Sequence, residues 1–147
     1  MINSFSANLM VADVTKSIEF YVDVIGATIA FTVDAEKNSL NEAVIDNTIF
    51  GSMRVGQTEL MLQERQNLIA DAPAAFSDED TPGGSLSLYF RVDNVDEVAE
   101  QIAAATPEIE VVKPMELTWY GMKEIWIKDP DGYVVTAGTP EGPPPAS

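Results

Sequence analysis

Histidine and cysteine are both absent from the 147 residues of this chain. Without cysteine there is no disulfide, no thiolate metal ligand and no cysteine nucleophile. Without histidine the chain lacks the commonest metal ligand and the usual general base near neutral pH. Any chemistry must therefore depend on carboxylates, hydroxyls, amides, lysine or tyrosine.

Basic residues are scarce as well, since eight Lys and Arg stand against 24 Asp and Glu for a formal net charge of −16. This charge repels the phosphates of nucleic acids and anionic membranes, and it attracts cationic ligands. We therefore expect neither a nucleic-acid nor a membrane partner. No apolar run approaches the length of a membrane span and no basic leader precedes one, so we expect a cytoplasmic protein.

Two segments show the same pattern, alternating residues followed by helical spacing. In SLSLYFRV, residues 85–92, every second residue is apolar, which predicts a strand with one buried face. Residues 93–105 follow with apolar residues at helical spacing and acids in the first turn. Residues 6–11 alternate in the same way, and helical spacing continues from there to Gly26, an expected C-terminal cap.

Both halves continue with strand-like segments, which are residues 27–33, 47–55 and 59–64 in the first half and 109–113, 123–129 and 133–138 in the second. The two strand–helix units align at an offset of 81 positions, 87 minus 6, which indicates an internal duplication. The sequence therefore predicts an α+β fold built from two βαβββ modules in one domain.

Composition suggests where the modules begin and end. We expect module one at 1–64, a linker at 65–84 with a short helix around 68–70, and module two at 85–138. The remaining residues, 139–147, include three consecutive prolines and are expected to be a disordered tail.

Two motifs resemble a known family. VADVTKSIEFYVDVIGA, residues 11–27, and EIWIKDPDGYVVTAG, residues 124–138, are similar to the vicinal oxygen chelate superfamily, which includes glyoxalase I, ring-cleaving dioxygenases and bleomycin-resistance proteins. The resemblance covers the chain before the proline tail. It implies an open cup of mixed sheet with helices outside, and a homodimer. Whether two modules of one chain close the cup, or chains exchange strands, stays open.

The resemblance also implies four metal-ligand positions, which fall here on Ser6, Met61, Ser87 and Thr136. Two serine hydroxyls, a thioether and a threonine cannot replace the His and Glu ligands that hold a divalent ion. We therefore expect no metal and no cofactor. In lacking the metal ligands, the chain resembles the metal-free, bleomycin-resistance-like branch of the superfamily.

The polar sides of the strands would line the pocket. Aromatic residues near the second motif, in LTWYGMKEIWIKDPDG, offer faces on which a cation can stack. Trp126 faces the pocket if its neighbours Ile125 and Ile127 face a helix. The expected ligand contacts are Ser6, Asn8, Glu59, Met61, Ser87, Tyr89, Arg91, Trp119, Tyr120, Glu124, Trp126 and Thr136.

Three functions stay open. The first is a metal-free protein that binds a cationic or aromatic small molecule, with sequestration and antibiotic resistance as its role. The second is a metal-independent lyase or isomerase with Glu124 or Glu59 as general base. The third is a metal-dependent glyoxalase or dioxygenase. Both glutamates have a simpler alternative as solvated strand carboxylates or partners of Arg54, Arg91 or Lys123.

Overall fold

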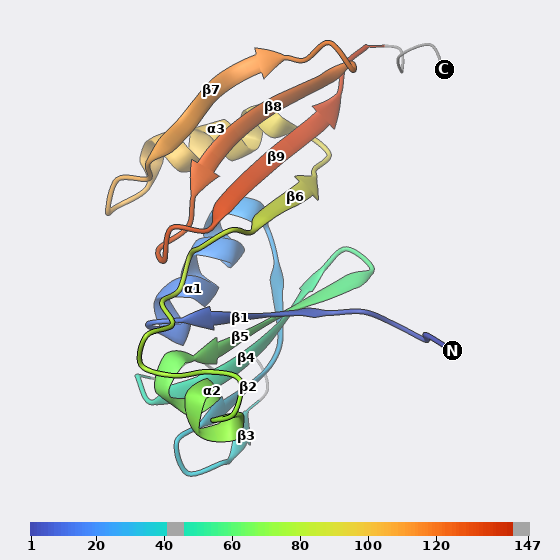
Figure 1. Ribbon diagram of the computed structural model, residues 1–147. Coiled ribbons are helices and arrows are strands. Elements are labelled where there is room, and N and C mark those ends of the chain that lie inside the picture. Colours follow the sequence, from blue (N-terminus) through green and yellow to red (C-terminus); the bar gives the residue numbers. More distant parts are fainter. Residues whose placement is uncertain (41–45, 143–147) are drawn as a thin grey trace. The chain divides into compact units, whose positions relative to one another are not determined.

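The computed structural model describes residues 1–40 and 46–142 (Figure 1). Contacts divide the chain into two compact units, Met1–Gly84 (unit 1) and Ser85–Ser147 (unit 2). No helix in the described part of the chain is long and apolar enough to cross a membrane.

Unit 1 is a five-stranded mixed sheet with helices. Its elements are β1 (Ala7–Val11), α1 (Val14–Phe20), the π-helical turn η1 (Tyr21–Ile25), β2 (Thr28–Asp34), β3 (Ser39–Leu40), β4 (Thr48–Val55), β5 (Thr58–Glu64) and α2 (Arg65–Asp71). The strand order is β1-β5-β4-β2-β3, in which β1 and β5 are parallel and the other pairs are antiparallel.

Unit 2 repeats this order with one helix and four strands. Its elements are β6 (Ser87–Arg91), α3 (Val95–Ala104), β7 (Val111–Leu117), β8 (Met122–Lys128) and β9 (Val134–Pro140). The strand order is β6-β9-β8-β7, with β6 and β9 parallel and the other pairs antiparallel. The predicted α+β fold of two βαβββ modules is confirmed.

Local signals fix both major helices. Asp13 and Asn94 are the N-caps of α1 and α3, and each carboxylate or amide oxygen accepts a backbone N–H from the first turn. Gly26 ends η1 with φ +86°, a left-handed conformation that glycine adopts without strain. In the turn before β9, Asp129 accepts the backbone N–H groups of Asp131 and Tyr133, which holds the turn closed.

Several boundaries differ from the prediction. Strand β7 begins later and continues through Pro114 to Leu117, because it is an edge strand in which a proline need not donate a hydrogen bond. Helix α2 starts as soon as β5 ends, since the Glu64 side chain caps it by accepting the backbone N–H groups of Gln66 and Asn67. Pairing with Met122 carries β9 on to Pro140. Residues 143–147 of the expected tail lie outside the described residues.

The two units distribute bulk differently between helix and strand. In unit 1 the buried Ile18 of α1 lies over Gly51 of β4, where an added Cβ would meet Ile18 Cδ1 at 2.8 Å. The strand register of unit 2 puts Ile125 at the position that corresponds to Gly51, and the 81-residue offset puts Ala99 at that of Ile18. Unit 1 therefore has the larger residue on its helix, and unit 2 has it on its strand.

Candidate functional site

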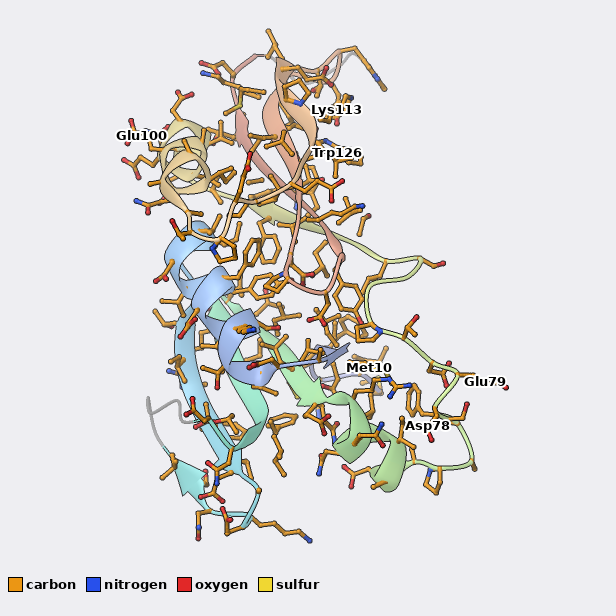
Figure 2. The ribbon with its side chains drawn as sticks, turned by 90° about the vertical axis from the view of Figure 1, so that its left-hand side faces the viewer. Met10, Asp78, Glu79, Glu100, Lys113 and Trp126 are labelled. Carbon is orange, nitrogen blue, oxygen red and sulfur yellow. The ribbon has the colours of Figure 1, made fainter. Side chains whose placement is uncertain are left out.

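The side chains of β8 alternate between two faces of the unit 2 sheet. Ile125 and Ile127 are 6% and 0% exposed, on the face that packs against α3. Figure 2 shows Glu100 of α3 on one side of this sheet and Trp126, with Lys113 of β7, on the other. Trp126 therefore lies on the face opposite the helix, as the alternation with Ile125 and Ile127 predicts. We call the face opposite α3 the polar face.

Strand register arranges the polar face in two rows. One row contains Tyr89, Thr136, Trp126 and Lys113, and the next contains Arg91, Gly138, Glu124 and Glu116. Each row crosses all four strands, β6, β9, β8 and β7. Residues far apart in the sequence are thus brought into lateral contact.

Glu124 lies at the centre of the polar face and is completely buried. Tyr120 Oη donates a hydrogen bond to Glu124 Oε1, and Trp126 Nε1 donates to Oε2 at 3.1 Å. A buried carboxylate requires such donors, because an unpaired charge away from water is costly. The alternative of a solvated strand carboxylate is therefore wrong for Glu124. Its side chain is held between two aromatic residues.

Tyr89 reaches toward the same carboxylate across β9. The strand residue beneath its hydroxyl is Gly138, where an added Cβ would lie 2.5 Å from Tyr89 Oη. Burial raises the pKa of Tyr89, and the charge and hydrogen bonding of Glu124 raise it further, while the charge of Arg91 opposes them. Gly138 therefore provides the space through which the phenol approaches Glu124.

The hydrogen bond to Glu124 also raises the pKa of Tyr120, with burial as the second cause. Both phenols consequently remain protonated at neutral pH and act as hydrogen-bond donors. The polar face thus places neutral donors around one buried anionic group.

Two cations lie over aromatic rings of the polar face. The Arg91 guanidinium carbon is 5.3 Å from the ring centroid of Tyr89, and Lys113 Nζ is 5.6 Å from that of Trp126. Lys113 also forms an ion pair with Glu116. These are cation–π distances, and they show that the aromatic faces accept positive charge.

Trp119 does not join this cluster. It is 85% exposed in the turn between β7 and β8 and lies edge-on to Tyr120, with ring centroids 5.3 Å apart. Ser87 is exposed at the start of β6, while Thr136 is buried between Tyr89 and Trp126 in its row. The structure therefore gathers Tyr89, Tyr120, Glu124, Trp126 and Thr136 of the expected contacts in unit 2.

The expected contacts of unit 1 form a separate polar group. Asn8 pairs with Met61 in register and donates its amide to Gln63 Oε1 at 2.9 Å. Glu59 is exposed and accepts a hydrogen bond from Ser52 Oγ at 3.3 Å, and Arg54 lies opposite it. Ser6 precedes β1. For Glu59 the simpler alternative, a solvated strand carboxylate, agrees with the structure.

Two residues of the polar face, Lys113 and Gly138, were not predicted from the sequence. Lys113 was hidden because irregularities on both sides of it break the alternation of β7. Gly138 carried a usable signal, since a glycine inside a strand often marks a close approach by another group.

The residues at the implied metal positions do not fit a metal. Thr136 and Ser87 of unit 2 offer hydroxyls, and Ser6 and Met61 of unit 1 offer a hydroxyl and a thioether. Within residues 1–40 and 46–142, no three acidic side chains lie close enough together to hold an ion. Glu124 is occupied by Tyr120 and Trp126, so it adds no open ligand.

The glyoxalase/bleomycin resistance protein/dioxygenase superfamily model matches residues 2–136. The chain belongs to this superfamily. Solved structures agree on the fold: a protein of unknown function from Agrobacterium tumefaciens is 23% identical with a TM-score of 0.70, and the match covers 95% of this chain and 94% of that one.

A superfamily member from Nocardioides is 18% identical with a TM-score of 0.67, covering 100% of this chain and 89% of its own. Another, from Sphaerobacter thermophilus, is 21% identical with a TM-score of 0.63, covering 95% and 98%. No curated protein matches the chain. The name of the superfamily covers both enzymes and resistance proteins, so membership alone does not decide between catalysis and binding.

Proposed function

We propose that this superfamily member is a metal-free binding protein of the bleomycin-resistance-like kind, which holds a planar organic cation on the polar face of unit 2. The observation that carries the proposal is the buried Glu124 carboxylate between Tyr120 and Trp126. A buried anion next to an indole face is suited to a ligand that is both charged and flat.

The charge of the whole chain supports the same ligand. A net charge of −16 raises the local concentration of cations and speeds their encounter with the protein, an effect that falls as salt is added. Sequestration of a toxic cation, and hence antibiotic resistance, is the biological role that we propose.

The proposal includes a cytoplasmic homodimer. Strands β1 and β3 are the edges of the first sheet, and β6 and β7 are those of the second. Edge strands expose unpaired backbone groups that a second copy can cover.

A second candidate is a metal-independent lyase or isomerase. The hydrogen bond between Tyr120 and Glu124 favours it, because a carboxylate that accepts a proton beside a phenol that donates one can serve acid–base catalysis. Glu59 is exposed, and the side chain that donates to it is the Ser52 hydroxyl, not a phenol. Glu124 is therefore the general base of this candidate. Turnover of a bound compound, rather than stoichiometric binding, would favour it.

The proposal can be tested by calorimetry with bleomycin and with proflavine, a planar acridinium that carries amino groups. We expect Glu124→Gln to weaken binding about tenfold or more, because a hydrogen bond or ion pair to a charged group contributes about 1.5–3 kcal/mol. Trp126→Ala should weaken it about threefold to thirtyfold, from a cation–π contribution of about 0.5–2 kcal/mol.

Glu59→Gln is the matched control, since it removes the same charge from an exposed position of unit 1. It should bind as wild type does. If neither compound binds wild type below the millimolar range, or if Glu124→Gln binds as tightly as wild type, the cation proposal is wrong.

A further inference from the structure

Two of the chain's own side chains occupy the groups that the proposed ligand needs. The Tyr120 hydroxyl donates to the Glu124 carboxylate, and the Lys113 ammonium lies over the Trp126 ring at 5.6 Å. Tyr120 comes from the turn before β8 and Lys113 from the edge strand β7. The polar face is therefore already filled by an aromatic donor and by a cation.

We propose that Tyr120 and Lys113 take the place of the ligand in the free protein and that the ligand displaces both. This inference rests on the proposed function and makes its ligand class more specific. A compound that replaces a phenol on Glu124 must carry an N–H or O–H donor on its ring, and one that replaces an ammonium on Trp126 must carry positive charge. The ligand class is thus a planar cation with a hydrogen-bond donor attached to the ring.

Tyr120 can leave Glu124 without breaking the backbone of its turn. The turn is closed by backbone hydrogen bonds from Thr118 to Met122 at 2.8 Å and from Gly121 to Thr118 at 3.1 Å, and Thr118 Oγ1 accepts the Met122 N–H at 3.0 Å. None of these bonds involves the Tyr120 side chain. Tyr120 is half-buried, and its ring neighbour Trp119 is exposed, so the phenol can turn outward on the side of Trp119.

Lys113 can leave Trp126 even more easily. Its side chain is 47% exposed and its ion pair with Glu116 is at the surface, where such pairs contribute little. Trp126, in contrast, is anchored by its own hydrogen bond to Glu124. The two displaced side chains thus come from a turn and an edge strand, while the two groups that receive the ligand are joined by their own hydrogen bond.

The displacement lowers the apparent affinity of the wild-type protein, because a ligand binds only the fraction of molecules in which the site is free. We expect Tyr120→Phe to bind proflavine about tenfold more tightly, since the competing hydrogen bond to a charged group is gone. Lys113→Gln should bind it about twofold to fivefold more tightly, from the loss of an exposed cation–π contact. If Tyr120 and Lys113 instead supported the binding site, both substitutions would weaken proflavine binding.

Fluorescence titration with two acridinium cations separates the two displacements. N-methylacridinium has the ring and the charge of proflavine but no N–H donor, so it can replace Lys113 and cannot replace Tyr120. Its affinity should rise in Lys113→Gln and stay unchanged in Tyr120→Phe. Lys16→Gln, which removes an exposed charge from α1 in unit 1, is the matched control and should behave as wild type.

If proflavine binds wild type but binds Tyr120→Phe equally or more weakly, the displacement of Tyr120 is wrong while the proposed function stands. The same result for Lys113→Gln refutes the displacement of Lys113. If neither cation binds wild type or any variant, the proposed function itself is wrong and the inference fails with it.

Discussion

The two units share a strand order and a register but carry different side chains at matching positions. Where unit 2 has Tyr89, Thr136 and Trp126 in one row, unit 1 has Asn8, Met61 and Ser52. Where unit 2 has Arg91, Gly138 and Glu124 in the next, unit 1 has Met10, Gln63 and Phe50. A single backbone plan therefore supports two chemically different faces.

The contrast between Gly138 and Gln63 explains much of this difference. Gln63 is buried, and its amide nitrogen donates to Asn67 in the first turn of α2 at 2.6 Å and to Asp71, the last residue of α2, at 2.7 Å. Phe50, at the position of Glu124, stacks on Phe31 with ring centroids 5.9 Å apart. Unit 1 thus satisfies its polar groups internally, whereas the glycine in unit 2 leaves room for Tyr89 and a charged centre.

The largest effect is expected when a small residue of unit 1 is replaced by the larger residue that unit 2 has at the same position. Gly51→Ile would give β4 the residue that β8 has at this position, and its side chain would collide with Ile18. We expect a loss of stability of about 1–3 kcal/mol or more from overpacking. Urea denaturation measures the change.

The double variant Gly51→Ile with Ile18→Ala recreates the arrangement of unit 2. Ile18→Ala alone should cost about 2–5 kcal/mol because it leaves a cavity. The two changes should compensate, so the double variant should be more stable than the sum of the single effects by about 0.5–3 kcal/mol. Simple additivity would show that Ile18 and Gly51 do not share one packing site.

A smaller effect on stability, and a clear spectroscopic one, is expected from Gly138→Ala. Its methyl group would force out Tyr89, which is 40% exposed and free to turn toward water, so stability should change by less than about 1 kcal/mol. The pKa of Tyr89 should fall back toward 10, because the burial and the proximity of Glu124 that raise it are lost.

Ultraviolet titration of the four tyrosines measures this shift. In wild type, the raised pKa of Tyr89 stabilises the fold below the unfolded value of about 10, and this contribution disappears as the pH rises through the higher folded value. Tyr89→Phe identifies the titration step. An unchanged alkaline titration in Gly138→Ala would mean that Gly138 does not position Tyr89.

The smallest effect is expected in the β2–β3 hairpin, which has no counterpart among residues 85–142. Asp34 accepts the backbone N–H of Asn38 at 2.8 Å and its side-chain amide at 3.1 Å. The backbone hydrogen bond is the main reason that the pKa of Asp34 is lowered, and burial opposes it. The carboxylate therefore stabilises the fold above the unfolded pKa near 3.8.

This stabilisation is lost as the pH falls through the lower folded pKa. Asp34→Asn should be slightly less stable than wild type at neutral pH, and the two proteins should converge in acid. Thermal unfolding across this pH range tests the expectation. A difference that persists at the acid end would show that the charge of Asp34 is not its source.

The sequence predicted the strands and helices well where the local signals were strong. Alternation over residues 85–92, the caps at Asp13 and Asn94 and the glycine at position 26 are all local, and the structure follows them. Two-residue β3 has too few residues to show a period. The extent of β7 depends on which strand it borders, and no local pattern contains that information.

The site was predicted only in part for the same physical reason. Residue parity correctly placed Trp126 and Glu124 on one face, because side-chain direction in a strand follows the period of two. Parity has no meaning in a turn, so the sequence could not distinguish Tyr120, which binds Glu124, from the exposed Trp119. The burial of Glu124 depends on which of these two side chains covers it, so it could not be predicted from the sequence.

The opposite placement of the larger residue in the two units, on the helix in one and on the strand in the other, also limits recombination between the two halves of the gene. Two halves of one gene that descend from a common ancestor can recombine with each other, and gene conversion copies segments between them. A crossover that joined α1 to β8 would set Ile18 against Ile125 and overfill the core, while the reciprocal product would set Ala99 against Gly51 and leave it hollow. Each recombinant would be less stable than the parent, so neither half can take this helix from the other unless the facing strand residue changes with it.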